Sequence, residues 1–164
     1  MMHHFSCLTP SYEGLEVIKQ VAHGRDVYDI GSGNGYWTYM LRRLGVDVWA
    51  IDNAESEWRT MWIGDTIMTD GVNFLREKDG GKDAVCLMVY PVVGGEFTKK
   101  IIEAYKGRTV VVAGTMNGNG YTGFKDRKVE EWMLERGWKT VGRIPLPSFP
   151  GKDEGLCVFE RESG

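Results

Sequence analysis

Cysteine is scarce in this sequence, and the three that occur lie far apart, at Cys7, Cys86 and Cys157. An odd number of distant cysteines without a Cys-x-x-Cys pair argues against a disulfide framework and against a zinc site, and no other metal site is expected. Cys86 and Cys157 fall inside apolar, strand-like runs, where cysteine behaves as a small hydrophobic residue. This pattern predicts a reduced, cytoplasmic protein.

Strong charge and long apolar runs are also missing. The net charge of −3 and the pI near 5.7 argue against a protein whose main task is to grip nucleic acid. No apolar run approaches the length of a membrane span, and the N-terminus has no signal-peptide pattern. A chain of 164 residues can bury a real core. We expect one domain over residues 1–164, in which an N-terminal helix within 1–24 covers the site and 25–164 form the core.

Short apolar runs alternate with amphipathic segments along most of the chain. A first helix is expected to begin at Thr9-Pro10, with Thr9 as its cap. The predicted strands are residues 27–30, 46–51, 60–63, 84–90 and 109–113, followed by a pair near 138–144 and 156–160. Strands that alternate with helices imply a parallel sheet. The predicted fold is therefore α/β, a single doubly wound, mostly parallel seven-stranded sheet with helices on both faces and an antiparallel C-terminal strand.

The most informative run is Val-Tyr-Asp-Ile-Gly-Ser-Gly-Asn-Gly, residues 27–35. A strand containing Asp29 turns through three alternating glycines into an amphipathic helix, which brings backbone N–H groups close to a ligand. The dinucleotide fingerprint Gly-x-Gly-x-x-Gly requires a third glycine where Tyr36 stands. The run departs from that fingerprint and reads Asp-x-Gly-x-Gly-x-Gly instead.

That pattern resembles the first motif of the class I S-adenosylmethionine-dependent methyltransferases, which have a Rossmann-like fold. The resemblance extends from about Val27 to Phe159 and is most specific over residues 29–35. It implies that S-adenosylmethionine binds at the carboxyl ends of the strands. The candidate cofactor-binding residues are Asp29, Gly31, Ser32, Gly33, Asn34, Gly35, Asp52, Asn53, Asp65 and Thr66.

The resemblance assigns separate duties to three acidic residues. Asp29 helps to orient the amino-acid end of the cofactor. Asp52, at the end of the second predicted strand, binds the ribose hydroxyls, although an aspartate there can also simply cap a helix. Asp65, placed after the predicted strand 60–63, meets the adenine amino group. The short connection between Asp52 and Asp65 indicates that the usual second helix is reduced or missing, and Trp62 beside it either stacks on adenine or packs in the core.

The end of the fourth predicted strand departs from the family. Many amino-methyltransferases carry Asn/Asp-Pro-Pro-Tyr/Phe there, whereas this chain has Val-Tyr-Pro-Val over residues 89–92. Tyr90 is the candidate catalytic residue, as a residue that lines the methyl-transfer site, and packing is the other interpretation. The glycine-rich residues 114–123 form either a lid or a plain surface loop.

The leading hypothesis is S-adenosylmethionine-dependent methyl transfer to a small molecule or a protein side chain. A second hypothesis is a non-catalytic binding or scaffold protein with a vestigial methyltransferase fold, because fold alone does not confer activity. A third is a nicotinamide-dependent oxidoreductase. Tyr36 in place of a glycine argues against the third hypothesis, as does the placement of Tyr121 and Lys125 in a glycine-rich loop. Neither a nucleic acid nor a membrane is expected as a partner.

Overall fold

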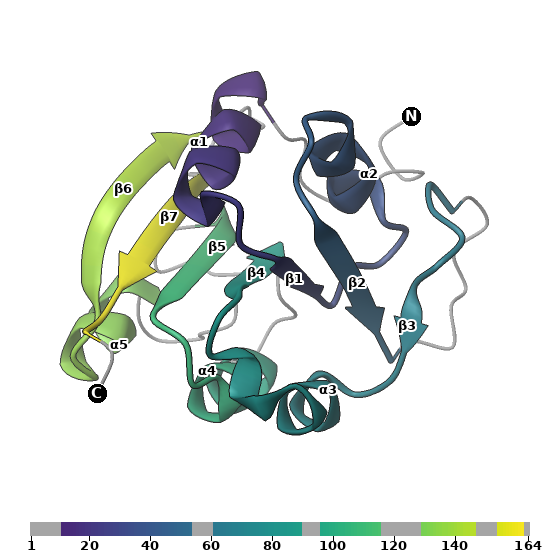
Figure 1. The fold of residues 1–164 in the computed structure, drawn as a ribbon. Helices are drawn as coiled ribbons and strands as arrows, with labels where there is room; N and C mark the ends of the chain where they lie inside the picture. Colours follow the sequence, from purple (N-terminus) through teal and green to yellow (C-terminus); the bar gives the residue numbers. More distant parts are fainter. Residues whose placement is uncertain (1–10, 54–60, 90–95, 116–128, 147–153, 163–164) are drawn as a thin grey trace.

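The structure, a computed structural model, describes residues 11–53, 61–89, 96–115, 129–146 and 154–162. Seven strands form one sheet in the order β3-β2-β1-β4-β5-β7-β6. The first five strands in that order are parallel, while β7 is antiparallel to both β5 and β6. The predicted fold class is confirmed: the chain has a Rossmann-like α/β fold (Figure 1).

The elements follow one another along the chain in the predicted order. They are α1 (Tyr12–Ala22), β1 (Val27–Ile30), α2 (Tyr36–Arg43), β2 (Val48–Asp52), β3 (Ile67–Met68), α3 (Gly71–Glu77), the 3₁₀ turn η2 (Asp79–Gly81), β4 (Val85–Val89), α4 (Glu96–Ala104), β5 (Thr109–Thr115), α5 (Val129–Glu135), β6 (Lys139–Pro145) and β7 (Glu154–Glu160). None of the helices among these residues is long and apolar enough to cross a membrane.

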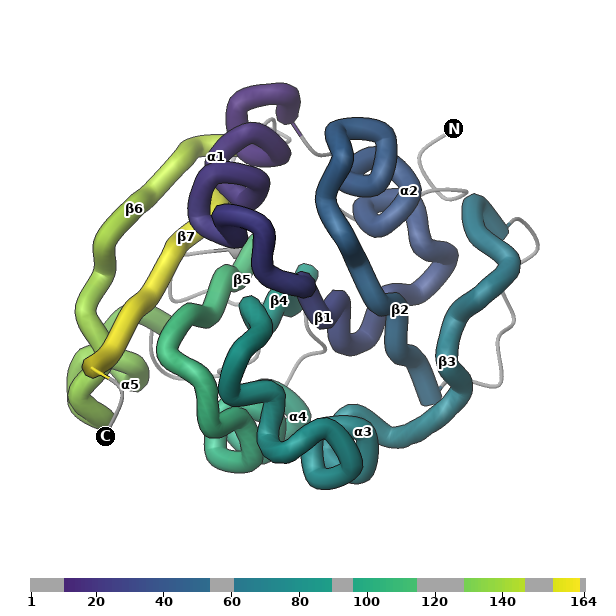
Figure 2. Tube along the Cα trace, in the orientation of Figure 1, coloured from purple at the N-terminus to yellow at the C-terminus, as the bar shows by residue number. Residues whose placement is uncertain are grey.

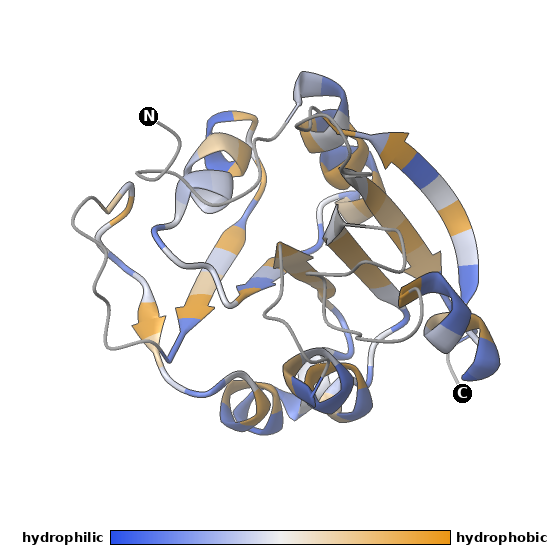
Figure 3. Ribbon diagram, turned by 180° about the vertical axis from the view of Figure 1, so that it is seen from behind, coloured by the Kyte–Doolittle hydropathy of each residue, from blue (hydrophilic) through white to orange (hydrophobic). Residues whose placement is uncertain are grey.

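The centre of the sheet is apolar on both faces. Every residue of β1 is buried, and β4 is buried as far as Met88, as expected for strands covered on both sides. Cys86 and Cys157 are buried within this layer, as predicted, and neither forms a disulfide. In Figure 3 the hydrophobic colours gather on the strands, and the helices carry hydrophilic colours on their outward sides.

Helices cover the two faces of the sheet unequally. One core lies under α1 and α2 and includes Leu15, Ile18, Trp37 and Leu41. The other core lies under α3, α4 and α5 and includes Phe74, Leu75, Ile101, Ile102, Trp132 and Met133. Figure 1 shows α1 and α2 on one side of the sheet and α3 and α4 on the other. The sequence-derived expectation of helices on both faces is therefore confirmed.

The first helix begins later than predicted. Ser11 has extended backbone angles, and its hydroxyl accepts a hydrogen bond of 2.9 Å from the backbone N–H of Gly14. Ser11 is therefore the N-cap and Tyr12 the first helical residue, so the predicted cap at Thr9 is wrong. Thr9 itself lies outside the described residues.

The third strand was also misplaced. The predicted strand 60–63 is not a strand over its described part, and β3 forms instead at Ile67–Met68, beside β2. The apolar pair Trp62 and Ile63, which suggested a strand, packs against α2 and the glycine-rich turn. Their hydrophobicity is satisfied by a helix face and a loop, which sequence periodicity does not distinguish from a sheet.

The position of β1 sets the location of the candidate site. It lies between β2 on one side and β4 on the other, both parallel to it, as the trace in Figure 2 makes clear. The connections leave β1 and β4 in opposite directions across the sheet, to β2 and to β5. In open α/β sheets, ligands bind at the carboxyl ends of strands where the order reverses in this way.

Candidate functional site

The glycine-rich turn leaves β1 at this reversal point. Gly31, Gly33 and Gly35 have φ values of +80°, +59° and +82°, in the left-handed region that side chains disfavour. The turn is fastened to the neighbouring strand, because the N–H groups of Gly31 and Ser32 both donate to the carbonyl of Ile51, at 2.7 and 3.0 Å. The alternating glycines therefore serve the backbone path of the turn.

Asp52 is the last residue of β2 and reaches across to this turn. Its Oδ2 accepts a hydrogen bond of 2.6 Å from the backbone N–H of Gly33, nineteen residues earlier. Both residues were candidate cofactor-binding residues in the sequence, Gly33 from the glycine motif and Asp52 from the family resemblance, and the structure brings them into direct contact. Asn53 follows as an exposed residue at the same edge. A carboxylate held in this way keeps lone pairs for further donors, so it can accept hydroxyl groups of a ligand.

Asp29 lies on β1 and is buried, with 1% of its surface exposed. Its Oδ2 accepts a 2.7 Å hydrogen bond from the hydroxyl of Thr38 on α2. Burial raises the pKa of the Asp29 carboxyl to about 7; the Thr38 hydrogen bond opposes that rise, the charge of Asp52 adds to it, and Arg42 opposes it. Neutral and ionised forms are thus both accessible near neutral pH.

Buried polar atoms without a hydrogen-bond partner gather around the turn. Among the described residues, Asp29 Oδ1 on β1 and Ser32 Oγ in the turn make no hydrogen bond. Thr66 Oγ1, before β3, and Thr98 Oγ1, on α4, also make none. Such groups are rare in folded proteins and costly unless a ligand or water satisfies them. Asp29 Oδ1 can accept a hydrogen bond from an ammonium group, and the Ser32 hydroxyl can donate or accept a hydrogen bond. These atoms fit a polar ligand at the end of β1.

Asn34, in contrast, supports the turn from within. It is fully buried, its side-chain oxygen accepts from the N–H of Tyr36 at 3.1 Å, and its carbonyl accepts from the N–H of Trp62 at 2.9 Å. Trp62 packs edge-on against the ring of Tyr36 and beside that of Tyr39. Of the two interpretations of Trp62, stacking on a ligand or packing, its contacts favour packing.

The structure corrects the reason for choosing Asp65. Both Asp65 and Thr66 precede β3 and so do not lie at the carboxyl end of a strand. The exposed Asp65 carboxylate instead pairs with both guanidinium nitrogens of Arg42, at 2.8 and 3.0 Å, and this arginine lowers its pKa. The predicted strand 60–63 ends before Asp65, whereas β3 begins after it. Asp65 was therefore wrongly expected to follow the third strand.

Asp70 is the acidic residue that follows β3, and sequence analysis missed it. Its Oδ2 accepts a 3.2 Å hydrogen bond from the N–H of Asn73 and caps α3. The Asp-Gly pair before an apolar helix was the signal available in the sequence. Thr38 and Arg42 were also missed, because a threonine and an arginine on a helix carry no distinguishing pattern.

The candidates for the acceptor side lie mostly outside the described residues. They are Tyr90, the candidate catalytic residue, and residues 116–123 of the predicted lid. On the described side, Phe97 in the first turn of α4 lies near Gly31, and a Cβ built on Gly31 would meet its ring at 3.4 Å. The start of α4 thus borders the glycine-rich turn.

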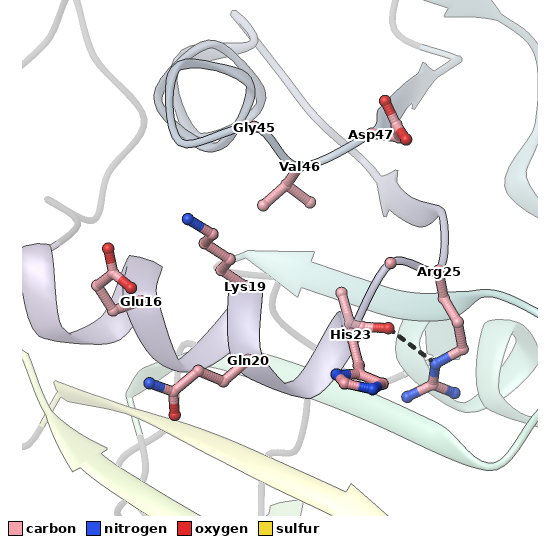
Figure 4. A pocket seen from close by; sticks show the side chains of 10 residues that line it. Glu16, Lys19, Gln20, His23, Arg25, Gly45, Val46 and Asp47 are labelled. Atoms are coloured by element: carbon pink, nitrogen blue, oxygen red, sulfur yellow. Dashed lines mark hydrogen bonds between the residues drawn. The ribbon is translucent and has the colours of Figure 1, made fainter.

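A cleft of about 470 Å³ lies at the opposite edge of the sheet. It is bounded by the end of α1 and by residues 45–47, just before β2 (Figure 4). Its charged side chains are of both signs, namely Glu16, Lys19, Arg25 and Asp47, and His23 lies beside them. The Arg25 guanidinium is already bonded to the carbonyls of Val21 and Ala22. None of the predicted site residues lines this cleft.

Comparison with known proteins reveals similarity in structure but none in sequence. The sequence matches no protein-family model, and no curated protein matches it. Similar solved structures include the methyltransferase domain of bacterial CtHen1-CN, with 13% identity and a TM-score of 0.60 over 89% of this chain and 94% of that one.

Two further structures cover nearly the whole chain. Magnesium protoporphyrin IX methyltransferase (ChlM) from Synechocystis PCC 6803 with bound SAM has 14% identity and a TM-score of 0.60, over 90% of this chain and 74% of that one. A protein in the NADB-Rossmann superfamily from Streptococcus agalactiae has 16% identity and a TM-score of 0.62, over 96% and 71%. At these identities the likeness shows the fold alone: the chain has a Rossmann-like α/β fold of the kind found in these methyltransferases.

Proposed function

We propose that this protein binds S-adenosylmethionine at the glycine-rich turn and transfers its methyl group to an acceptor. The observation that carries the proposal is the contact between Asp52 and the Gly33 N–H, beside the buried Asp29, where the strand order reverses. This arrangement brings a carboxylate that can accept ribose hydroxyls, a second, buried carboxyl group and an accessible backbone together in one small site, which supports the proposal.

The residues of the site match the polar groups of that cofactor. Asp52 would accept the ribose hydroxyls with the lone pairs that Gly33 leaves. Asp29 Oδ1, which has no partner among the described residues, would accept from the ammonium group. Asp70, the acidic residue after β3, takes the position that the family resemblance gives to the adenine contact, in place of Asp65.

The protein's part in the reaction is mainly to position the two reactants. The cofactor supplies a methyl group already activated on a sulfonium, and transfer to a nucleophile in line requires proximity and alignment. The acceptor would be a small molecule or a protein side chain that enters beside the carboxyl end of β4. Tyr90 would line that side, and a general base is needed only for an acceptor that is protonated.

Two alternatives give different experimental results. A nicotinamide-dependent enzyme would bind NAD or NADP, but Tyr36 occupies the position of the third glycine of that fingerprint and packs against Trp62. A vestigial fold that serves as a scaffold would bind S-adenosylhomocysteine without turnover, or bind no nucleotide at all.

Binding is tested by calorimetry with S-adenosylhomocysteine, NAD and NADP on the full chain. We expect micromolar binding of S-adenosylhomocysteine only. Asp52→Asn keeps an oxygen for Gly33 but loses the charge, so affinity should fall about tenfold or more. Asp47→Asn, an exposed residue at the opposite edge, is the matched control and should bind as the wild type does. Binding of NAD in preference to S-adenosylhomocysteine would reject the proposal.

Catalysis is tested separately with S-adenosylmethionine labelled in the methyl group. The protein is incubated with pooled metabolites and with unmethylated protein extract, and label is followed into each fraction. Transfer that Asp52→Asn reduces and Asp47→Asn does not would establish a methyltransferase and its acceptor class. Cofactor binding with no transfer to any fraction would favour the scaffold hypothesis.

A further inference from the structure

Residues 61–65 belong to the connection between β2 and β3, which in this kind of sheet usually contains a helix. Parallel strands need a crossover connection, which in α/β sheets is usually a helix packed on one face. The connection from β2 to β3 has no helix over its described residues. Instead, the 61–65 segment lies against α2 and the glycine-rich turn.

Three contacts fix this segment on the turn and on the helix that follows it. The N–H of Trp62 donates to the carbonyl of Asn34 at 2.9 Å, within the turn. The Trp62 ring centroid is 4.8 Å from that of Tyr36 and 5.3 Å from that of Tyr39. The Asp65 carboxylate holds Arg42, whose guanidinium also donates to the carbonyl of Val48. The segment is thereby tied to the turn, to α2 and to β2.

Ile63 packs closely beside Gly35. A Cβ built on Gly35 would lie 2.5 Å from its Cγ1 and 2.8 Å from its Cδ1, so the isoleucine fills the space beside this glycine. Gly35 has a left-handed conformation and is the N-cap of α2. The isoleucine thus packs beside Gly35 at the end of the turn, while Asp52 bonds the Gly33 N–H within it.

We infer that Trp62 and Ile63 are positioning residues that hold the glycine-rich turn in the conformation that binds the cofactor. Glycines have more backbone conformations to lose than any other residue, so a turn with three of them needs external contacts to favour one path. A ligand that binds only one conformation loses affinity in proportion to the fraction of molecules in the others. This inference rests on the proposed function for its ligand but not for the conformational effect itself.

The test is native-state hydrogen exchange of the turn amides, combined with calorimetry. Exchange at Gly33, Gly35 and Tyr36 is compared in Trp62→Ala, Ile63→Ala and the wild type. Trp62→Phe keeps a ring against Tyr36 and is the conservative rescue. Met61→Ala removes a neighbouring but exposed side chain of the same segment and is the matched control. Ile63→Val serves if the alanine variant does not fold.

We expect both alanine variants to exchange the turn amides about tenfold faster and to bind S-adenosylhomocysteine about tenfold more weakly. Trp62→Phe and Met61→Ala should stay near the wild type, and Ile63→Val should fall between. Unchanged exchange at the turn in both alanine variants would overturn the inference. So would faster exchange throughout β1, β4 and β5, which indicates general destabilisation. If the wild type binds no S-adenosylhomocysteine, the proposed function fails, while exchange still decides the role of these residues.

Discussion

Asp29 illustrates how a single buried residue links stability to function. Its carboxyl is enclosed on β1, one oxygen is held by Thr38, and the other has no partner among the described residues. The charged groups facing it are Asp52 from β2 and Arg42 from α2. A purely structural role would be served better by an apolar residue, because burying a carboxylate is costly. A cationic group of a ligand that paired with the Asp29 carboxylate would offset the cost of burying it.

The buried carboxyl makes stability depend on pH. Its pKa rises from an ordinary value of 3.8 to about 7 on folding, so the folded chain binds the proton more tightly than the unfolded chain. This contribution to stability is fully present below about pH 4 and is lost as pH rises through 7. Between pH 5 and pH 8, the wild type should lose about 2–3 kcal/mol of unfolding free energy that Asp29→Asn does not lose.

Urea unfolding of both proteins at the two pH values measures this difference. Asparagine keeps an acceptor for Thr38, so the comparison isolates the ionisation. Parallel pH profiles for the two proteins would contradict the burial argument.

Gly35 gives a second prediction at the scale of one residue. Gly35→Ala combines left-handed strain with a clash against Ile63, whereas Gly45→Ala has the same strain, at φ +88°, with nothing within 4 Å. We expect Gly45→Ala to cost about 1 kcal/mol of unfolding free energy and Gly35→Ala about 1–3 kcal/mol more. Chemical denaturation of the two variants measures the excess. Equal losses of unfolding free energy in the two variants would mean that Ile63 does not restrict the space beside Gly35.

Sequence alone identified the residues whose spacing is dictated by backbone geometry. The alternation of Gly31, Gly33 and Gly35 identified the turn after β1, and all three glycines have left-handed conformations. The distance from Gly33 to Asp52 follows from one strand–helix–strand unit, and the two residues meet. Contacts that depend on side-chain packing across the fold, such as Ile63 against Gly35, leave no periodic trace in the sequence.

At the scale of elements, the connection around β3 was the hardest to predict. Strand β3 has only two residues, and the two apolar side chains before it pack on a loop and a helix. The buried central strands were predicted well: β1 has the expected bounds, and β4 differs from the prediction by one residue at each end. A strand of two residues is too short to leave a comparable apolar run in the sequence.

The start of α3 provides a prediction for an element. Asp70 caps this helix and also follows β3 at the site, whereas Ser11 caps α1 with a similar hydrogen bond. Both Asp70→Ala and Ser11→Ala should therefore cost about 1 kcal/mol of unfolding free energy. Only Asp70→Ala should also weaken S-adenosylhomocysteine binding, by fivefold or more. Calorimetry and thermal unfolding on the pair separate the two effects, and equal affinities would remove Asp70 from the site.

At the scale of the whole molecule, the two ends of the parallel strands carry different groups of residues. The carboxyl ends of β1 and β2 carry the glycine-rich turn and Asp52, beside the buried Asp29. The amino ends carry the open cleft with charges of both signs, including Lys19 and Asp47. Strand order and the buried polar groups favour the carboxyl ends of the strands over this cleft as the cofactor site.

The glycine amides decide between these two ends of the strands in one experiment. The full chain, labelled with ¹⁵N, is titrated with S-adenosylhomocysteine while its amide resonances are followed. We predict large shifts at Gly31, Gly33 and Gly35 and none at Gly24 and Gly45, which lie beside the cleft. Shifts confined to Gly24 and Gly45, or no shifts at millimolar ligand, would contradict the assignment of a cofactor site to the glycine-rich turn.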